Sequence, residues 1–251
     1  MWKEILDANG GLSTKEGSIY DKLGIKVNIS IINDVTQSSN AIISKKLDAA
    51  GYTINRTAFL SDKFKNAGVD VIMPYITNFS NGGDGIIAKS SINSVSDLVG
   101  AKIGVPEFSE AHTLVVWFVN QSDLSDSEKQ DIINNLIMFA TPDDAAKAFF
   151  SGQIDVAATW EPYLTQAKNM SDAHILFSTA SSSSLVMDGI LFNKDFAEKY
   201  PDVVSAFIDG ALQASELYEK DLTTIKSVMP MFSTSSDEDI LSNCASAKLT
   251  T

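Results

Sequence analysis

Apolar and polar positions alternate along this chain in a pattern that predicts strands and helices in turn. Residues 27–32 alternate apolar and polar side chains, and residues 69–76 form a short apolar run, as strands do. Residues 107–120 instead gather their apolar side chains on one helical face, and residues 34–44 are also expected to be helical. The repeated strand–helix order predicts an α/β fold with largely parallel sheets.

Several helix starts carry local signals. Residues 94–97 and 125–128 resemble capping boxes, and residues 141–144 join a cap, a proline and two acids. Pro201 opens a long amphipathic helix, and residues 236–247 are expected to be helical. A further helix is expected at 57–66, and further strands at 47–53, 84–89, 102–105, 136–140, 154–159, 174–178 and 189–193.

One short pattern occurs twice. Residues 44–50 and 151–157 both read serine, two variable positions, an aliphatic residue, aspartate, a variable position and alanine. Each copy leads into a strand that ends in a polar or aromatic cluster, at 53–56 and 159–162. Ligands of open α/β sheets lie at the carboxyl ends of strands. The repeat therefore predicts two lobes facing one cleft, and the alternative is a chance match of a short pattern.

Composition narrows the functional classes. The chain has 251 residues, 44% hydrophobic and 20% charged, which is ordinary for a globular protein. Its net charge of −13 argues against nucleic-acid binding. The single cysteine, Cys244, excludes an internal disulfide, and only two histidines leave no histidine-rich metal site. No apolar run is long enough to span a membrane, and no signal sequence opens the chain, so any leader is expected to be removed or to lie outside it.

Several short motifs follow one another along the chain: Trp2, Ala8-Asn9-Gly10-Gly11, and residues 51–56, 81–87, 97–105 and 188–190. Their order resembles that in the substrate-binding proteins of nitrate/sulfonate/taurine-type ABC importers. The resemblance implies a two-lobed periplasmic-binding-protein (type II) fold, in which mostly parallel sheets flanked by helices are joined by two hinge crossings. It also implies a protein that binds rather than catalyses, without a cofactor or metal. The implied partners are a small-molecule ligand and an ABC permease.

The resemblance also sets expectations for organisation and location. One lobe is expected to comprise residues 1–86 and 190–251, the other residues 87–189, with crossings near 84–89 and 185–193. The protein is expected to be an extracytoplasmic monomer that meets the membrane only through its permease or a lipid anchor outside this chain. Family members have a strand before the position of Trp2 and continue beyond Thr251, so we expect the chain to lack part of both ends of the first lobe.

A helix start provides the first candidate binding residues. Ser109, His112 and Thr113 follow a predicted strand, where free N–H groups and the helix dipole favour an anion. The alternative is an ordinary helix cap. Glu110 would repel an anion unless its side chain points away.

The repeat and the crossings provide the other candidates. Thr53, Asn55 and Arg56 follow the first repeat strand, and arginine could pair with an oxyanion, although a surface or salt-bridge role is the alternative. Gly83 lies in a turn before Asp84, and this aspartate and Asp188 each begin a crossing strand, where paired acids indicate an amine or a hydrogen-bond network between lobes. Trp160, Glu161 and Trp2 complete the candidate set, because a tryptophan offers a flat surface to an apolar stem or a cation.

These residues lead to one main hypothesis and two alternatives. The main hypothesis is a solute-binding protein that delivers a small sulfonate, amine or zwitterionic ligand to an ABC importer. The first alternative is an enzyme of the same fold, such as a thiamine-pyrimidine synthase-like protein, but no nucleophile–base pair has a recognisable spacing. The second is a ligand-sensing domain whose output module lies outside this chain.

Overall fold

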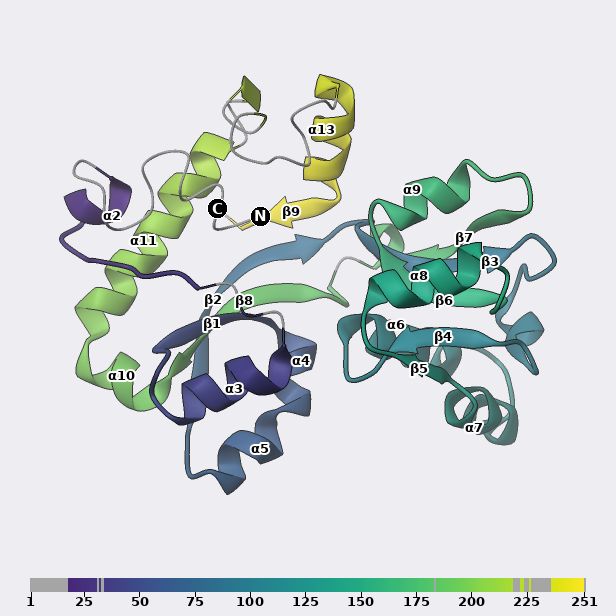
Figure 1. The fold of residues 1–251 in the computed structure, drawn as a ribbon, viewed down its shortest axis with the longest axis horizontal. Coiled ribbons are helices and arrows are strands. Elements are labelled where there is room, and N and C mark those ends of the chain that lie inside the picture. Colours follow the sequence, from purple (N-terminus) through teal and green to yellow (C-terminus); the bar gives the residue numbers. More distant parts are fainter. Residues whose placement is uncertain are drawn as a thin grey trace.

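The computed structural model describes residues 18–250, apart from 31, 33, 183, 219–221, 224–225 and 227–235. The described part of the chain forms two lobes, each built on one sheet (Figure 1). The first sheet has the strand order β1 (Ala49–Thr53), β8 (Met187–Asn193), β2 (Val71–Ser80), β9 (Ala247–Leu249). The second has the order β5 (Ile137–Phe139), β4 (Ile103–Pro106), β6 (Val156–Trp160), β3 (Asp84–Lys89), β7 (Ala173–Ser178).

Helices flank both sheets. The described helices are α2 (Ile19–Lys22), α3 (Val35–Ile43), α4 (Ile54–Phe59), α5 (Ser61–Asn66), α6 (Glu110–Asn120), α7 (Asp126–Asn134), α8 (Pro142–Phe150), α9 (Tyr163–Lys168), α10 (Lys194–Lys199), α11 (Pro201–Tyr218) and α13 (Asp237–Ala245), with short 3-10 turns η1 (Val95–Leu98) and η2 (Thr179–Ser181). The predicted capping boxes at Ser94 and Ser125 are both present, and Thr141 caps α8 with Pro142 at its first position. Local sequence therefore determines where these helices begin.

The helix expected at 57–66 is instead two short helices that meet at Leu60.

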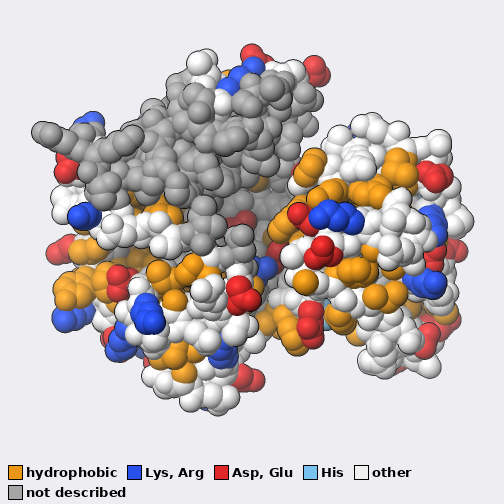
Figure 2. All heavy atoms as spheres, viewed as in Figure 1, with side chains coloured by type: hydrophobic (Ala, Val, Ile, Leu, Met, Phe, Trp, Pro, Cys, Tyr) orange, Lys and Arg blue, Asp and Glu red, His pale blue; other side chains and the backbone are white. Residues whose placement is uncertain are grey.

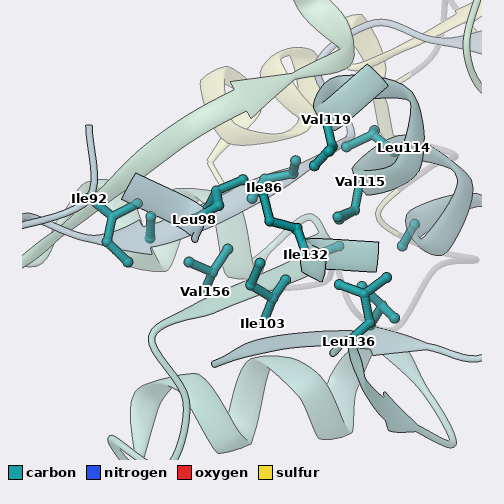
Figure 3. Packing of buried hydrophobic residues seen from close by; sticks show 14 of the residues in the cluster. Ile86, Ile92, Leu98, Ile103, Leu114, Val115, Val119, Ile132, Leu136 and Val156 are labelled. Atoms are coloured by element: carbon teal, nitrogen blue, oxygen red, sulfur yellow. The ribbon is translucent and has the colours of Figure 1, made fainter. Parts of the chain in front are cut away.

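An interior strand of each sheet, β3 in one and β8 in the other, is buried on both faces. Ile86 and Ile87 are consecutive in β3 and point to opposite sides, each into its own apolar cluster. Figure 3 shows the cluster around Ile86, where Leu114 of α6 and Ile132 of α7 cover the sheet. In the first lobe, Leu191 and Phe192 of β8 divide between two clusters in the same way. Such two-sided burial explains the continuous apolar runs of these strands.

The expectation of mostly parallel sheets is wrong for the first lobe. Every ladder recorded in its sheet is antiparallel. In the second sheet β4 runs parallel to β5 and β6, whereas β3 runs antiparallel to β6 and β7. The reason is that β8 and β3 each enter their sheet from the other lobe, and each is inserted between two strands that run the opposite way.

The expectation of a strand at 27–32 is also wrong, because the described residues of this segment belong to no ladder. Val27 and Ile29 pack instead against the apolar cluster of Tyr20 and Ala214. An extended segment lying across such a cluster produces the same alternation of apolar and polar residues as a strand in a sheet.

The chain crosses between the two sheets twice, over residues 81–83 and residues 179–186. The two connections lie side by side: Ser80 N–H donates to the carbonyl of Val186 (2.9 Å), and Gly82 N–H donates to Thr179 Oγ1 (2.8 Å). The lobe limits of 1–86 with 190–251 and 87–189 stay a prediction. The two sheets assign each strand to a lobe, but they do not assign the loops and helices.

The repeated sequence pattern corresponds to equivalent places in the two sheets. The first copy leads into β1 and the second into β6, and each strand lies beside a crossing strand. Thr53 at the end of β1 pairs with Asp188, and Trp160 at the end of β6 pairs with Asp84. Both Asp84 and Asp188 are followed by glycine and isoleucine. A Cβ on the glycine of β3, Gly85, would lie 2.6 Å from a backbone oxygen, so the close approach of the chains requires glycine there.

Candidate ligand-binding cleft

Charged side chains from both lobes meet beside the crossings. Arg56 comes from α4 in the first lobe and Glu110 from α6 in the second, and Arg56 Nη2 lies 3.2 Å from Glu110 Oε2. Asp84 and Asp188 lie at the starts of the two crossing strands, and the charge of Glu110 acts on both. Figure 2 shows the surface indented along the line where the lobes meet. We call Arg56, Glu110, Asp84 and Asp188 the interlobe cluster.

Helix caps set the positions of Arg56 and Glu110. Thr53 Oγ1 accepts a hydrogen bond from the backbone N–H of Arg56 (3.0 Å), which starts α4 immediately after β1. Ser109 Oγ accepts from the N–H of His112 (3.1 Å) and donates to the carbonyl of Pro106 (2.7 Å). The buried hydroxyls of Thr53 and Ser109 are therefore engaged by their own helix starts.

Two carboxyl groups of the cluster, those of Asp84 and Asp188, are difficult to ionise. The pKa of Asp84 is raised from 3.8 to about 7, mainly by burial; the charges of Glu110 and Asp188 contribute to the rise, and a hydrogen bond from Ser80 opposes it. Burial and the charge of Glu110 also raise the pKa of Asp188, against the opposing effects of Asn78 and Arg56. Removal from water disfavours the charged form, and neighbouring negative charge adds to that effect. Glu110 itself has a side chain only 6% exposed and relies on Arg56 as its counter-ion.

Aromatic side chains from both lobes lie next to the cluster. The ring of Phe59 on α4 lies 5.8 Å from Phe108 and 6.4 Å from His112, centroid to centroid. Phe59 is 44% exposed and Phe108 is 59% exposed. Burial lowers the pKa of His112, and its Nδ1 atom is buried without a hydrogen-bond partner. Arg56 Nε is likewise buried and unpaired.

Trp160 lies next to Asp84 in the second lobe. Directly opposed residues of an antiparallel pair point to the same face of the sheet, so the two side chains are neighbours. Trp160 is 37% exposed, and its indole N–H donates to Asp143 Oδ1 (3.3 Å), which orients the ring. Glu161 accepts hydrogen bonds from the N–H and hydroxyl of Thr165, both at 3.0 Å, so its carboxylate serves the start of α9.

The structure brings some of the sequence candidates together and gives others a local role. Arg56, Asp84 and Asp188 meet in one cluster, with Trp160 beside Asp84. The candidates with local roles are Thr53, Ser109, Thr113 (whose hydroxyl donates to the carbonyl of residue 109), Glu161, and Gly83, whose carbonyl accepts from the N–H of residue 161. Asn55 lies half-buried in the first turn of α4, and Trp2 lies outside the described residues.

Sequence reasoning missed three residues of this region. From the sequence, Glu110 is expected only to repel an anion, whereas its side chain forms an ion pair with Arg56 of the other lobe. An acid in the first turn of a helix is common for reasons of the helix dipole, so its sequence position gives no special signal. Phe59 and Phe108 were missed because exposed aromatic residues can be recognised only once the fold is known.

A model of the family described as NMT1/THI5 like matches residues 12–221. The chain belongs to this family. The taurine-binding periplasmic protein of Escherichia coli (strain K12) is 27% identical over 138 residues. That match covers 54% of this chain and 41% of the relative, so it spans less than half the length of this curated member.

Solved structures confirm the fold expected for the NMT1/THI5-like chain. The periplasmic aliphatic sulphonate binding protein SsuA from Escherichia coli matches with a TM-score of 0.78 and 16% identity, over 99% of this chain and 81% of that chain. The alkanesulfonate-binding protein SsuA from Xanthomonas axonopodis pv. citri, bound to MOPS, matches with a TM-score of 0.69 and 20% identity, over 92% and 78%. The predicted two-lobed α/β periplasmic-binding-protein fold and the predicted family resemblance are therefore both confirmed.

Two further observations concern the described residues of this NMT1/THI5-like chain. Over that part of the sequence, no helix combines the length and the apolar character needed to cross a bilayer. Likewise, no three or more histidine, cysteine or acidic side chains among the described residues are placed to hold a metal ion.

Proposed function

We propose that this protein is an extracytoplasmic solute-binding protein that captures a small polar ligand between its lobes and delivers it to the permease of an ABC importer. The ligand class is a sulfonate, an amine or a zwitterion. The observation that carries the proposal is the interlobe cluster: a family member with two lobes places charged residues from both at their junction. The named relatives are binding proteins, which favours this function over an enzyme or a sensor of the same fold.

The proposed ligand contacts come from both lobes. Arg56 and Asp188 contribute from the first lobe, and Asp84, His112 and Trp160 from the second. Six further candidates act indirectly, because we propose that they hold in place the backbone and the helix starts around the ligand. They are Thr53, Asn55, Gly83, Ser109, Thr113 and Glu161. Closure of the lobes would remove the ligand from water and present a joined surface to the permease. We propose that the protein acts as a monomer and that the two hinge crossings allow this closure.

Ligand-dependent thermal stabilisation tests the proposal. The protein is unfolded, freed of small molecules, refolded, and melted with a panel of sulfonates, amines, amino acids and pyrimidines. A ligand at one hundred times its Kd stabilises the folded state by about 2.7 kcal/mol. For a chain of this size that corresponds to a rise in Tm of roughly 5–10 °C. If no compound of the panel raises Tm, the proposed function is wrong.

A further inference from the structure

We infer that Glu110 determines the specificity of the cleft, and that it selects ligands carrying an organic cation over simple anions such as alkanesulfonates. The inference rests on the proposed function and makes its ligand class narrower. It would make an ammonium-bearing zwitterion the preferred ligand and a plain sulfonate a poor one.

The first argument is that the charge of Arg56 already has a counter-ion within the protein. Arg56 Nη2 contacts Glu110 Oε2 at 3.2 Å, and within the described part of the chain no other basic side chain forms an ion pair with the cluster. A sulfonate that took the guanidinium of Arg56 would leave the carboxylate of Glu110, only 6% exposed, without a counter-ion. Breaking a buried ion pair in this way is strongly unfavourable.

The second argument is the balance of charge around Arg56. Glu110 pairs with the guanidinium of Arg56, and its charge also acts on Asp84 and Asp188, of which only Asp188 is influenced by Arg56. Asp84 and Asp188 stand at equivalent positions of the two crossing strands, so they approach the junction from opposite lobes. A cationic group bound between them would let both carboxylates ionise with a counter-charge, whereas a second anion would add to the repulsion.

The third argument is the aromatic ring beside Asp84. Trp160 neighbours Asp84 on the same sheet face, is 37% exposed, and has its ring oriented by its bond to Asp143. A tryptophan face beside a carboxylate attracts an organic cation. The buried, unpaired nitrogen atoms Arg56 Nε and His112 Nδ1 also leave hydrogen-bonding capacity for a polar ligand group. We therefore assign the position beside Asp84 and Trp160 to an ammonium or similar group.

Calorimetric titration of matched ligand pairs tests this inference. Each pair differs only in the ammonium group: taurine with ethanesulfonate, and β-alanine with propionate. The full chain, freed of ligand and refolded, should bind the ammonium-bearing member about tenfold or more tightly, the effect of one charge-assisted contact. Glu110→Gln should reduce the ratio to less than about threefold, by weakening the ammonium ligand and freeing Arg56 for the simple anion.

Two further variants separate charge from structure. Glu107→Gln makes the same change three positions earlier, at an exposed residue, and should keep the wild-type ratio. Glu110→Asp retains the charge and should retain the preference, even if both affinities fall. Circular dichroism and Tm confirm that each variant is folded.

The outcomes distinguish this inference from the proposed function. The inference is wrong if the tightest ligand of the whole panel carries no cationic group, if the two members of its pair bind equally, or if Glu110→Gln leaves the ratio unchanged. In each of these cases ligand binding itself still supports the proposed function. If no compound binds to the wild-type protein, both are wrong.

Discussion

Replacing Asp84 by asparagine tests the electrostatics of the interlobe cluster most directly. Burial raises the pKa of this carboxyl from 3.8 to about 7. The folded state therefore binds more protons than the unfolded state between about pH 4 and pH 7. By linkage, the stability contributed by the protonated group is complete below about pH 4 and is lost as pH rises to about 7, after which the loss is constant.

The magnitude follows from the same values. A pKa that rises from 3.8 to about 7 corresponds to roughly 4 kcal/mol of lost stability when the carboxyl is ionised, and roughly 2–3 kcal/mol of this is lost between pH 5 and pH 8. The asparagine side chain carries no charge and has a volume similar to that of aspartate. We therefore expect the stability of Asp84→Asn relative to the wild type to increase by about 2–3 kcal/mol between these two pH values.

Urea unfolding followed by circular dichroism at pH 5, 6.5 and 8 measures this difference. Asp195→Asn is the matched control, because Asp195 is 76% exposed and pairs with Lys45 at the surface. It should differ from the wild type by no more than about 1 kcal/mol at each pH. If Asp84→Asn and the wild type change in parallel from pH 5 to pH 8, the assignment of a buried, reluctantly ionised Asp84 is refuted.

Two other substitutions test the packing of the second lobe by the same assay. Gly85→Ala would place its Cβ 2.6 Å from the carbonyl oxygen of Phe177 and should cost about 1–3 kcal/mol, whereas Gly51→Ala, which meets no atom within 4 Å, should change stability by less than about 0.5 kcal/mol. Equal effects would contradict the close approach of the strands. Asp155→Ala removes a carboxylate whose pKa is lowered by Lys89 at 2.6 Å, so it should cost about 1–3 kcal/mol at pH 7 and progressively less as pH falls below about 4. A cost that does not depend on pH would exclude this ionic contribution.

The sequence by itself determined the features that depend on neighbouring residues. The capping boxes at Ser94 and Ser125 and the start of α8 are predictable, because a cap joins groups only three positions apart. The internal repeat predicts equivalent strand ends, and the motif order predicts the family. Thr53 and Trp160 each lie at the last position of a strand, as the repeat predicts.

Only the tertiary structure decided how these pieces meet. The antiparallel first sheet depends on β8 returning from the other lobe between β1 and β2, which no local pattern encodes. The segment with Val27 and Ile29 alternates like a strand, yet it packs on an apolar cluster, because alternation records one buried face and not what covers it. The ion pair between Arg56 and Glu110 joins the two lobes, and its electrostatic effect depends on the burial of the Glu110 side chain. Charge and residue type can be read from the sequence, but the loss of water that raises the pKa values of Asp84 and Asp188 arises only in the folded protein.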